Sequence, residues 1–123
     1  MKNLFISLLA CLFLVFPAFA DEGVNPGDVV GVTMVCKDTD MLFEVADVHS
    51  KKGMEAARSH IQANTEQWRE ACAQLPMALE VQLVEVVKEF SGPGGKVIIW
   101  KGVANVGGFP TVYLPQIISG KDA

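Results

Sequence analysis

Apolar and polar residues alternate along residues 29–36, and this pattern predicts a β-strand. Val30, Val32, Met34 and Cys36 occupy every second position of the stretch. Since successive side chains of a strand point to opposite faces, these four are expected on one face. The strand therefore places Cys36 on its apolar side.

Two helical segments are expected next. Asp-Thr-Asp at residues 38–40 favours a helix N-cap and precedes a helical pattern over residues 41–50. Lys-Lys-Gly at residues 51–53 indicates the end of this helix, the alternative being one long helix that tolerates the glycine. Apolar residues at steps of three and four predict a second helical segment over residues 54–75, which Pro76 would end.

The rest of the chain has the pattern of β-structure. The alternation of the first of these strands slips in phase at Leu83 and Val84, which a β-bulge would explain. Strands are expected over residues 79–86, 97–104 and 111–114, joined by glycine-containing connections at residues 91–95 and 105–108.

This order of elements predicts an α+β fold. A small, bent antiparallel sheet, or an SH3-like half-barrel, with a helical insert after the first strand would satisfy it. We expect one domain over residues 29–115, a loose N-terminal tail over residues 21–28 and a frayed C-terminal tail over residues 116–123.

The N-terminal residues have the pattern of a secretory signal. Lys2 precedes an almost wholly apolar run over residues 4–16, and Pro17 breaks the run. Ala-Phe-Ala at residues 18–20 is the small-x-small pattern that a signal peptidase reads. We therefore predict a cleaved signal peptide over residues 1–20.

Two other interpretations of this segment predict a membrane attachment. An uncleaved anchor needs about 18 or more apolar residues, and this run is shorter. Leu-Leu-Ala-Cys at residues 8–11 loosely resembles a lipoprotein motif, but cleavage there would leave the apolar residues 12–20 at the new N-terminus. We expect a periplasmic or extracellular protein with no stable membrane insertion after cleavage.

The size and net charge of the chain limit the kinds of partner that it can bind. Removal of 20 of the 123 residues would leave 103, and loss of Lys2 would move the formal net charge from −4 to −5. An acidic chain is a poor nucleic-acid binder, because neutralisation of phosphates needs clustered lysine and arginine. We therefore expect a protein or another envelope macromolecule as the partner.

Cys36 and Cys72 are the two cysteines that remain after signal cleavage. Export to an oxidising compartment and an even count favour a disulfide between them. Two buried thiols that never meet are the alternative. Two cysteines alone are too few for a structural zinc site.

Titratable residues offer little catalytic or metal-binding chemistry. On one continuous helix His49 and His60 would lie about 16 Å apart along the axis, too far for one metal ion. Asp38 and Asp40 are interpreted as helix-capping residues, and the glutamates at positions 80, 85 and 89 as charges on the solvent face of a strand. We predict no catalytic residue, no metal site and no cofactor, and a small hydrolase using these aspartates or histidines is the least favoured function.

Trp100, Phe109 and Tyr113 form the candidate binding surface. They belong to neighbouring predicted strands and the connection between them. Aromatic side chains on a bent sheet beside a loop are typical of peptide- and glycan-binding surfaces. The alternative is that they fill the core, as a small domain requires.

The chain resembles several small uncharacterised exported bacterial proteins that belong to no named family. They share a strand ending in cysteine, an alanine-rich helical insert that closes on a second cysteine, and a valine-rich pair of strands ending near a tyrosine. The matching parts here are residues 35–36, 55–57, 71–72, 84–87, 97–100 and 112–113. The resemblance implies the same architecture and no activity.

Two functions are therefore expected in order of preference. The first is a non-catalytic interaction module that binds an envelope or extracellular macromolecule. The alternative is a binder of a small molecule or cell-wall fragment through an aromatic groove at Trp100, Phe109 and Tyr113.

Overall fold

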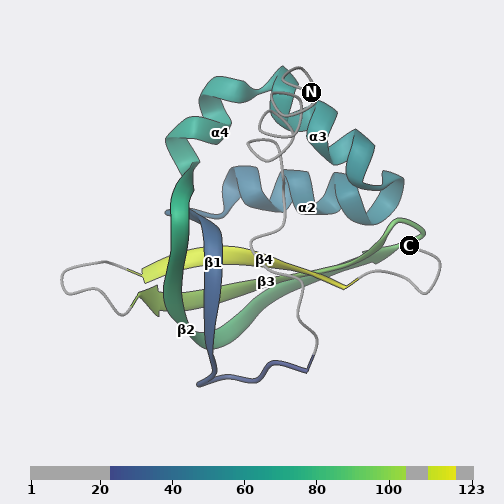
Figure 1. Ribbon diagram of the computed structural model, residues 1–123. Coiled ribbons are helices and arrows are strands. Elements are labelled where there is room, and N and C mark those ends of the chain that lie inside the picture. The colour runs from purple at the N-terminus through teal and green to yellow at the C-terminus, as the bar shows by residue number, and fades with distance from the viewer. Residues whose placement is uncertain (1–22, 105–110, 119–123) are drawn as a thin grey trace, which may run out of the picture.

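The computed structural model describes residues 23–104 and 111–118, so the predicted signal peptide and the connection over residues 105–108 lie outside the described residues. Within that part the chain forms three helices and a four-stranded antiparallel sheet, which confirms the α+β class (Figure 1). The elements are β1 (Val29–Cys36), α2 (Asp40–Lys52), α3 (Met54–Ala63), α4 (Thr65–Ala71), β2 (Cys72–Gly92), β3 (Gly95–Ala104) and β4 (Thr111–Ile118).

The strands follow one another in the order β1-β2-β3-β4 and close into a barrel. Closure rests on a single pair between the outer strands, Cys36 of β1 with Tyr113 of β4. The helices form a layer on one side of the strands, with α2 next to the sheet and α3 and α4 outside it (Figure 1). The helical insert after the first strand is thus confirmed.

β1 has the predicted bounds, and Val30, Val32 and Met34 are buried as the alternation requires. The pairing with β2 is irregular: Val32 pairs with Leu79, whereas Met34 pairs with Gln74. Residues 75–78 therefore lie opposite a single residue of β1 and bulge out of the ladder.

α2 ends as predicted, because Gly53 adopts a φ of +97°, a conformation that favours glycine. The N–H of Gly53 donates to the His49 carbonyl oxygen over 2.8 Å. Thr39 is the N-cap, but its side chain makes no capping hydrogen bond. The helical segment is broken at Gly53, and the alternative of one long helix is wrong.

The expected single helix over residues 54–75 is also wrong. α3 ends at Ala63, where the Asn64 amide donates to the His60 carbonyl oxygen over 2.9 Å. Such a side-chain bond competes with helix continuation. α4 ends at Ala71, and Cys72 already has an extended backbone because it pairs with Cys36. Pro76 lies in the bulged stretch of β2, where a missing N–H breaks no ladder bond.

β2 is longer than expected and pairs with two neighbouring strands. Its first half pairs with β1 and its second half with β3, so the strand curves through the barrel (Figure 1). Its pairing with β3 shifts register between Leu83 and Glu85 and again between Val86 and Lys88. The first shift is the predicted bulge.

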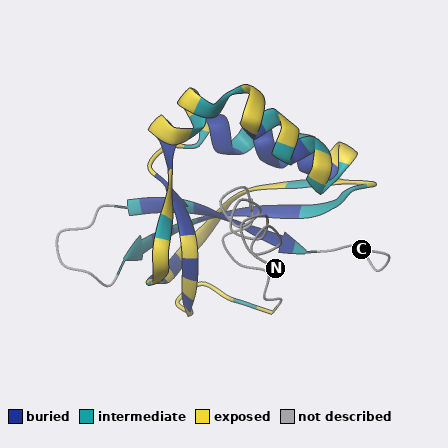
Figure 2. Cartoon of the chain, turned by 45° about the horizontal axis from the view of Figure 1, so that its top comes forward, coloured by how far each residue is buried: buried dark blue, intermediate teal, exposed yellow. Residues whose placement is uncertain are grey.

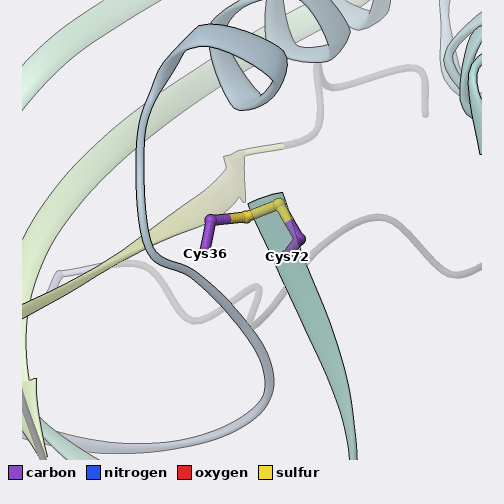
Figure 3. The surroundings of a disulfide bond; sticks show 2 residues. All are labelled: Cys36 and Cys72. Atoms are coloured by element: carbon purple, nitrogen blue, oxygen red, sulfur yellow. A yellow bond between two sulfur atoms is a disulfide. The ribbon is translucent and has the colours of Figure 1, made fainter. Parts of the chain in front are cut away.

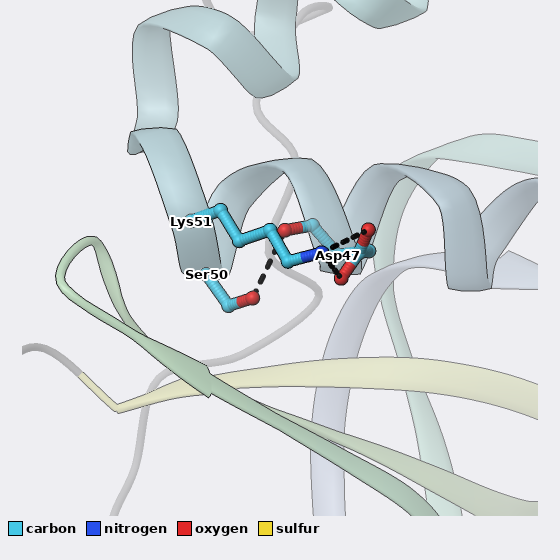
Figure 4. Close-up of polar contacts among 3 residues, drawn as sticks. All are labelled: Asp47, Ser50 and Lys51. Atoms are coloured by element: carbon cyan, nitrogen blue, oxygen red, sulfur yellow. Dashed lines mark hydrogen bonds and ion pairs between the residues drawn. The ribbon is translucent and has the colours of Figure 1, made fainter.

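The glycine-rich turn between β2 and β3 lies against the end of α2. Gly94 donates its N–H to the Ser50 carbonyl oxygen over 2.8 Å, which satisfies one of the carbonyls that a helix leaves open at its C-terminus. Figure 4 shows the hairpin beside this turn of the helix, where Ser50 and Lys51 both bond to Asp47. The turn thus holds the helix layer to the sheet.

β4 runs to Ile118, past the end expected at Leu114. The frayed tail expected from residue 116 is therefore wrong for residues 116–118. Gln116 is 2 % exposed and pairs with Ile98 of β3. Residues 119–123 lie outside the described part of the chain.

The core lies between the helices and the curved sheet. Figure 2 shows buried positions on the sides of the helices that face the strands and exposed positions on their outer sides. Every strand and α2 contribute a large, fully buried apolar side chain, namely Met34, Leu42, Leu83, Ile99 and Leu114. Each such side chain stabilises the fold by about 1.5–3 kcal/mol. Among the helices described, none is long and apolar enough to cross a membrane.

Candidate functional site

The predicted disulfide joins the end of β1 to the start of β2. Cys36 and Cys72 are register partners in the β1–β2 ladder, and their sulfur atoms are bonded (Figure 3). The next backbone bond, from the Lys37 N–H to the Ala71 carbonyl oxygen over 2.7 Å, continues the contact beyond the ladder. Both half-cystines are buried. The disulfide therefore ties the start and the end of the helical insert together.

A pocket of about 190 Å³ lies beside this disulfide. Its lining is mainly apolar and includes both half-cystines with Val35, Ala73 and Val112. These residues come from β1, β2 and β4, at the point where the single β1–β4 pair closes the barrel. The pocket thus lies where residues of these three strands meet.

Three charged side chains complete the pocket lining: Lys37, Arg69 and Glu70. All three residues are exposed. Within the described part of the chain, neither cation takes part in an ion pair, whereas Lys51 and Arg58 are each paired with an acid on their own helix. The charged ends of these side chains contribute little to the pocket, whose surface is nearly all apolar.

A second feature is an exposed apolar stretch on β2, which we call the valine segment (Val84, Val86 and Val87). These side chains are 40–42 % exposed and are three of the five exposed large hydrophobic residues in the described chain. They follow the last pair with β1, so β2 here is bonded to β3 along one edge, and no described strand pairs with the other.

Charged residues surround the valine segment. Glu85 lies within it and Lys88 and Glu89 follow it, all exposed. The Lys88 ammonium lies over two aromatic rings, 5.7 Å from the centroid of Phe43 and 5.4 Å from that of Phe90. Since Phe43 belongs to α2, this contact ties the segment to the helix layer.

The structure describes two of the three aromatic residues predicted as a binding surface, Trp100 and Tyr113. Trp100 is only 3 % exposed, and its indole N–H donates to the Gln116 side-chain oxygen over 2.9 Å. Tyr113 is half-buried, and Phe109 lies outside the described residues. For Trp100 the structure supports the alternative that the sequence left open, a place in the core.

The two histidines lie in different surroundings. His60 is half-buried, with its imidazole 3.1 Å from the Glu44 carboxylate. His49 is 4 % exposed and lies in the core. Burial lowers the pKa of the His49 imidazole, because the protein interior disfavours the charged form.

The candidate carboxylates are at the surface. Asp38 and Asp40 are exposed at the start of α2, and Glu80 and Glu85 are exposed on β2. Glu89 lies 3.3 Å from the Lys96 ammonium across the β2–β3 hairpin. In the described residues no group of three or more histidine, cysteine, aspartate or glutamate side chains is arranged to hold a metal ion.

The two features that the structure adds, the pocket beside the disulfide and the valine segment, had weak sequence signals. Lys37 and Arg69 flank the two cysteines but are 32 residues apart in the chain, and only the fold brings them to one pocket. Comparisons of the chain with models of protein families, with curated proteins and with solved structures found no match.

Proposed function

We propose that this chain is a small exported, non-catalytic interaction module that binds an envelope or extracellular macromolecule. The observation that carries the proposal is the valine segment, three large apolar side chains exposed within four residues of β2. Exposed apolar patches rimmed by polar residues are typical of protein interaction sites.

The chemistry of the segment favours contact through side chains over addition of a strand. Two register shifts in the pairing with β3 make β2 irregular here, and Glu85 and Lys88 add exposed charges. Bulges and edge charges are devices by which proteins prevent strand-to-strand pairing. The valines then supply an apolar centre and the charges a polar rim, which is the usual anatomy of a protein interface.

Support for export comes from the predicted signal peptide over residues 1–20 and from the disulfide, a bond that persists in oxidising compartments. The closed order of four antiparallel strands with an inserted helical layer supports, as a finer proposal, that the sheet is SH3-like. Both features suit a small rigid module that presents one surface outside the cytoplasm.

Site-directed photocrosslinking in the cells that make the protein tests this proposal. A photoreactive residue at Val87 should yield one discrete adduct with a macromolecule, and the same residue at Gln62, an exposed position on α3, should yield none. Val86→Lys should abolish the adduct, because a charge placed in an apolar interface is costly. Gln62→Lys is the matched control and should leave it intact.

Two results would overturn the proposal. One is equal crosslinking from Val87 and Gln62, which would mean that the segment has no preferred partner. The other is an adduct that survives Val86→Lys in a variant whose thermal unfolding matches the parent protein.

A further inference from the structure

We propose that Met77 is a site of oxidative modification, where hydrogen peroxide converts the thioether to a sulfoxide while the fold stays intact. Met77 lies on the bulge of β2 over residues 75–78, which shares no residue with the valine segment. The site goes beyond the proposed function, and it does not depend on whether the valine segment binds a partner.

Met77 differs from the other methionines in its exposure. Its exposed fraction is 74 %, the largest among the exposed large hydrophobic residues of the described chain. Met34 and Met41 are 1 % and 6 % exposed, and Met54 is partly buried and packs against the core. Met1 belongs to the predicted signal peptide. Of the described methionines, Met77 is therefore the one that a dissolved oxidant reaches most readily.

The bulge holds Met77 away from the rest of the fold. It lies opposite the single residue Thr33 of β1, so Met77 has no register partner in the described ladders. At the base of the bulge the Gln74 side-chain amide donates to the Thr33 carbonyl oxygen over 3.2 Å. Leu75 and Leu79, which flank the exposed residues, are partly buried and pack against the core. The bulge is thus anchored at both ends by groups other than the Met77 side chain.

The proposed step is a two-electron oxidation of the Met77 sulfur by hydrogen peroxide. The sulfur attacks one oxygen atom, so that an S–O bond forms and the O–O bond breaks. The leaving hydroxide takes the proton from the transferred oxygen and departs as water. The sulfur is thereby oxidised to a sulfoxide and the peroxide is reduced, which makes an apolar side chain polar.

Burial decides whether the fold tolerates this change. At Met34 the same step would place a polar oxygen in the core, where a polar group without a hydrogen-bond partner is costly. At Met77 water hydrates the new oxygen, because most of the side chain is exposed. Oxidation at the bulge therefore changes the polarity of the surface at one point and leaves the core as it was.

Treatment of the disulfide-bonded protein with dilute hydrogen peroxide tests the site. Peptide mapping by mass spectrometry follows which methionine gains an oxygen atom over time. Met77 should gain its oxygen at least about tenfold faster than Met34 or Met41, which react only when the core opens. The protein oxidised at Met77 alone should keep the urea midpoint of the untreated protein.

Two matched variants and a measurement in cells complete the test. Met77→Leu removes the sulfur and keeps a similar volume, and it should slow uptake of the first oxygen at least about tenfold. Met54→Leu makes the same change at the partly buried methionine and should leave that rate unchanged. In cells that make the protein, a pulse of isotope-labelled hydrogen peroxide should place the label mainly on Met77.

Four results would each overturn the proposal. The first is oxidation of Met34, Met41 or Met54 at the rate of Met77, and the second is equal uptake of the first oxygen by Met77→Leu and Met54→Leu. The third is a lower urea midpoint for the protein oxidised at Met77 alone. The fourth is a label spread evenly over the methionines of the protein recovered from cells. The crosslink from Val87 is a separate measurement, so neither proposal fails with the other.

Discussion

The contact between the β2–β3 turn and the end of α2 predicts a large effect from a very small substitution, Gly94→Ala. A Cβ atom added to Gly94 would lie 2.3 Å from the His49 carbonyl oxygen and 2.7 Å from the Gly53 nitrogen. Both neighbours are backbone atoms of the helix end, so neither can rotate away. Gly94 does not have a positive φ, and the substitution therefore tests the close approach alone.

The magnitude follows from the distances. Ordinary van der Waals contact of a Cβ begins at 3.4 Å, so the turn must withdraw by roughly 1 Å. That movement would break the 2.8 Å hydrogen bond from the Gly94 N–H to the Ser50 carbonyl oxygen. Overpacking costs about 1–3 kcal/mol, and a buried group left without its partner costs about 1–3 kcal/mol. We expect Gly94→Ala to lower the free energy of unfolding by about 2–6 kcal/mol, the sum of the two costs.

Urea denaturation of the disulfide-bonded protein measures this loss as a lower midpoint at unchanged slope. Gly31→Ala is the matched control, because its new Cβ would lie 3.7 Å from the Ala78 Cβ in ordinary contact. We expect this control to keep or gain up to about 1 kcal/mol, since alanine restricts the unfolded chain. Equal stabilities of the two variants would refute the reasoning that the turn is pressed against the helix.

Three further predictions concern stability. Replacing Cys36 and Cys72 together with alanine should cost about 3–4 kcal/mol by the chain-entropy model, measured by urea denaturation, and an unchanged midpoint would contradict it. Burial lowers the pKa of His49, so below about pH 6.5 the unfolded state binds a proton more readily than the folded state does, and the free energy of unfolding should fall. His49→Leu should make the free energy of unfolding, measured by denaturation across that pH range, less dependent on pH. Gln116→Leu should lower the free energy of unfolding by about 1–3 kcal/mol, because the Trp100 indole N–H loses its acceptor. In a double-mutant cycle, the variant with both Gln116→Leu and Trp100→Phe should lose less stability than the sum of the two single variants.

Local signals in the sequence were sufficient for much of the fold. The strand over residues 29–36 follows from strict alternation, and the end of α2 follows from a glycine that adopts a positive φ. The bulge at Leu83 was visible as a slip in phase. Each of these signals concerns neighbours in the chain, and no distant segment overrides them.

The boundary between α4 and β2 depends on distant residues and was missed. Leu75 continues the helical periodicity, and Pro76 is an ordinary place for a helix to end. Pairing of Cys72 and Ala73 with the end of β1 instead draws this stretch into the sheet. A propensity worth a few tenths of a kcal/mol per residue is outweighed by ladder bonds and a disulfide.

Burial of the candidate site residues was the least predictable feature. Val97, Ile98, Ile99 and Trp100 are consecutive and all buried, so β3 is covered on both faces and alternation gives no indication of which aromatic is exposed. The valine segment shows the converse, because valines that resemble core positions in sequence are exposed where β1 no longer pairs with β2. Which face of a strand is covered is decided by the neighbouring elements, not by the strand itself.

The shape of β2 explains why the module has two separate candidate surfaces. A strand that pairs with β1 in its first half and β3 in its second must change neighbours midway, and the last pair with β1 comes at Gln82. Before that point the strand pairs with β1 and contributes Cys72 and Ala73 to the pocket. After it the strand loses its cover on one edge and exposes the valine segment. The change of neighbouring strand after Gln82 therefore separates the two surfaces along β2.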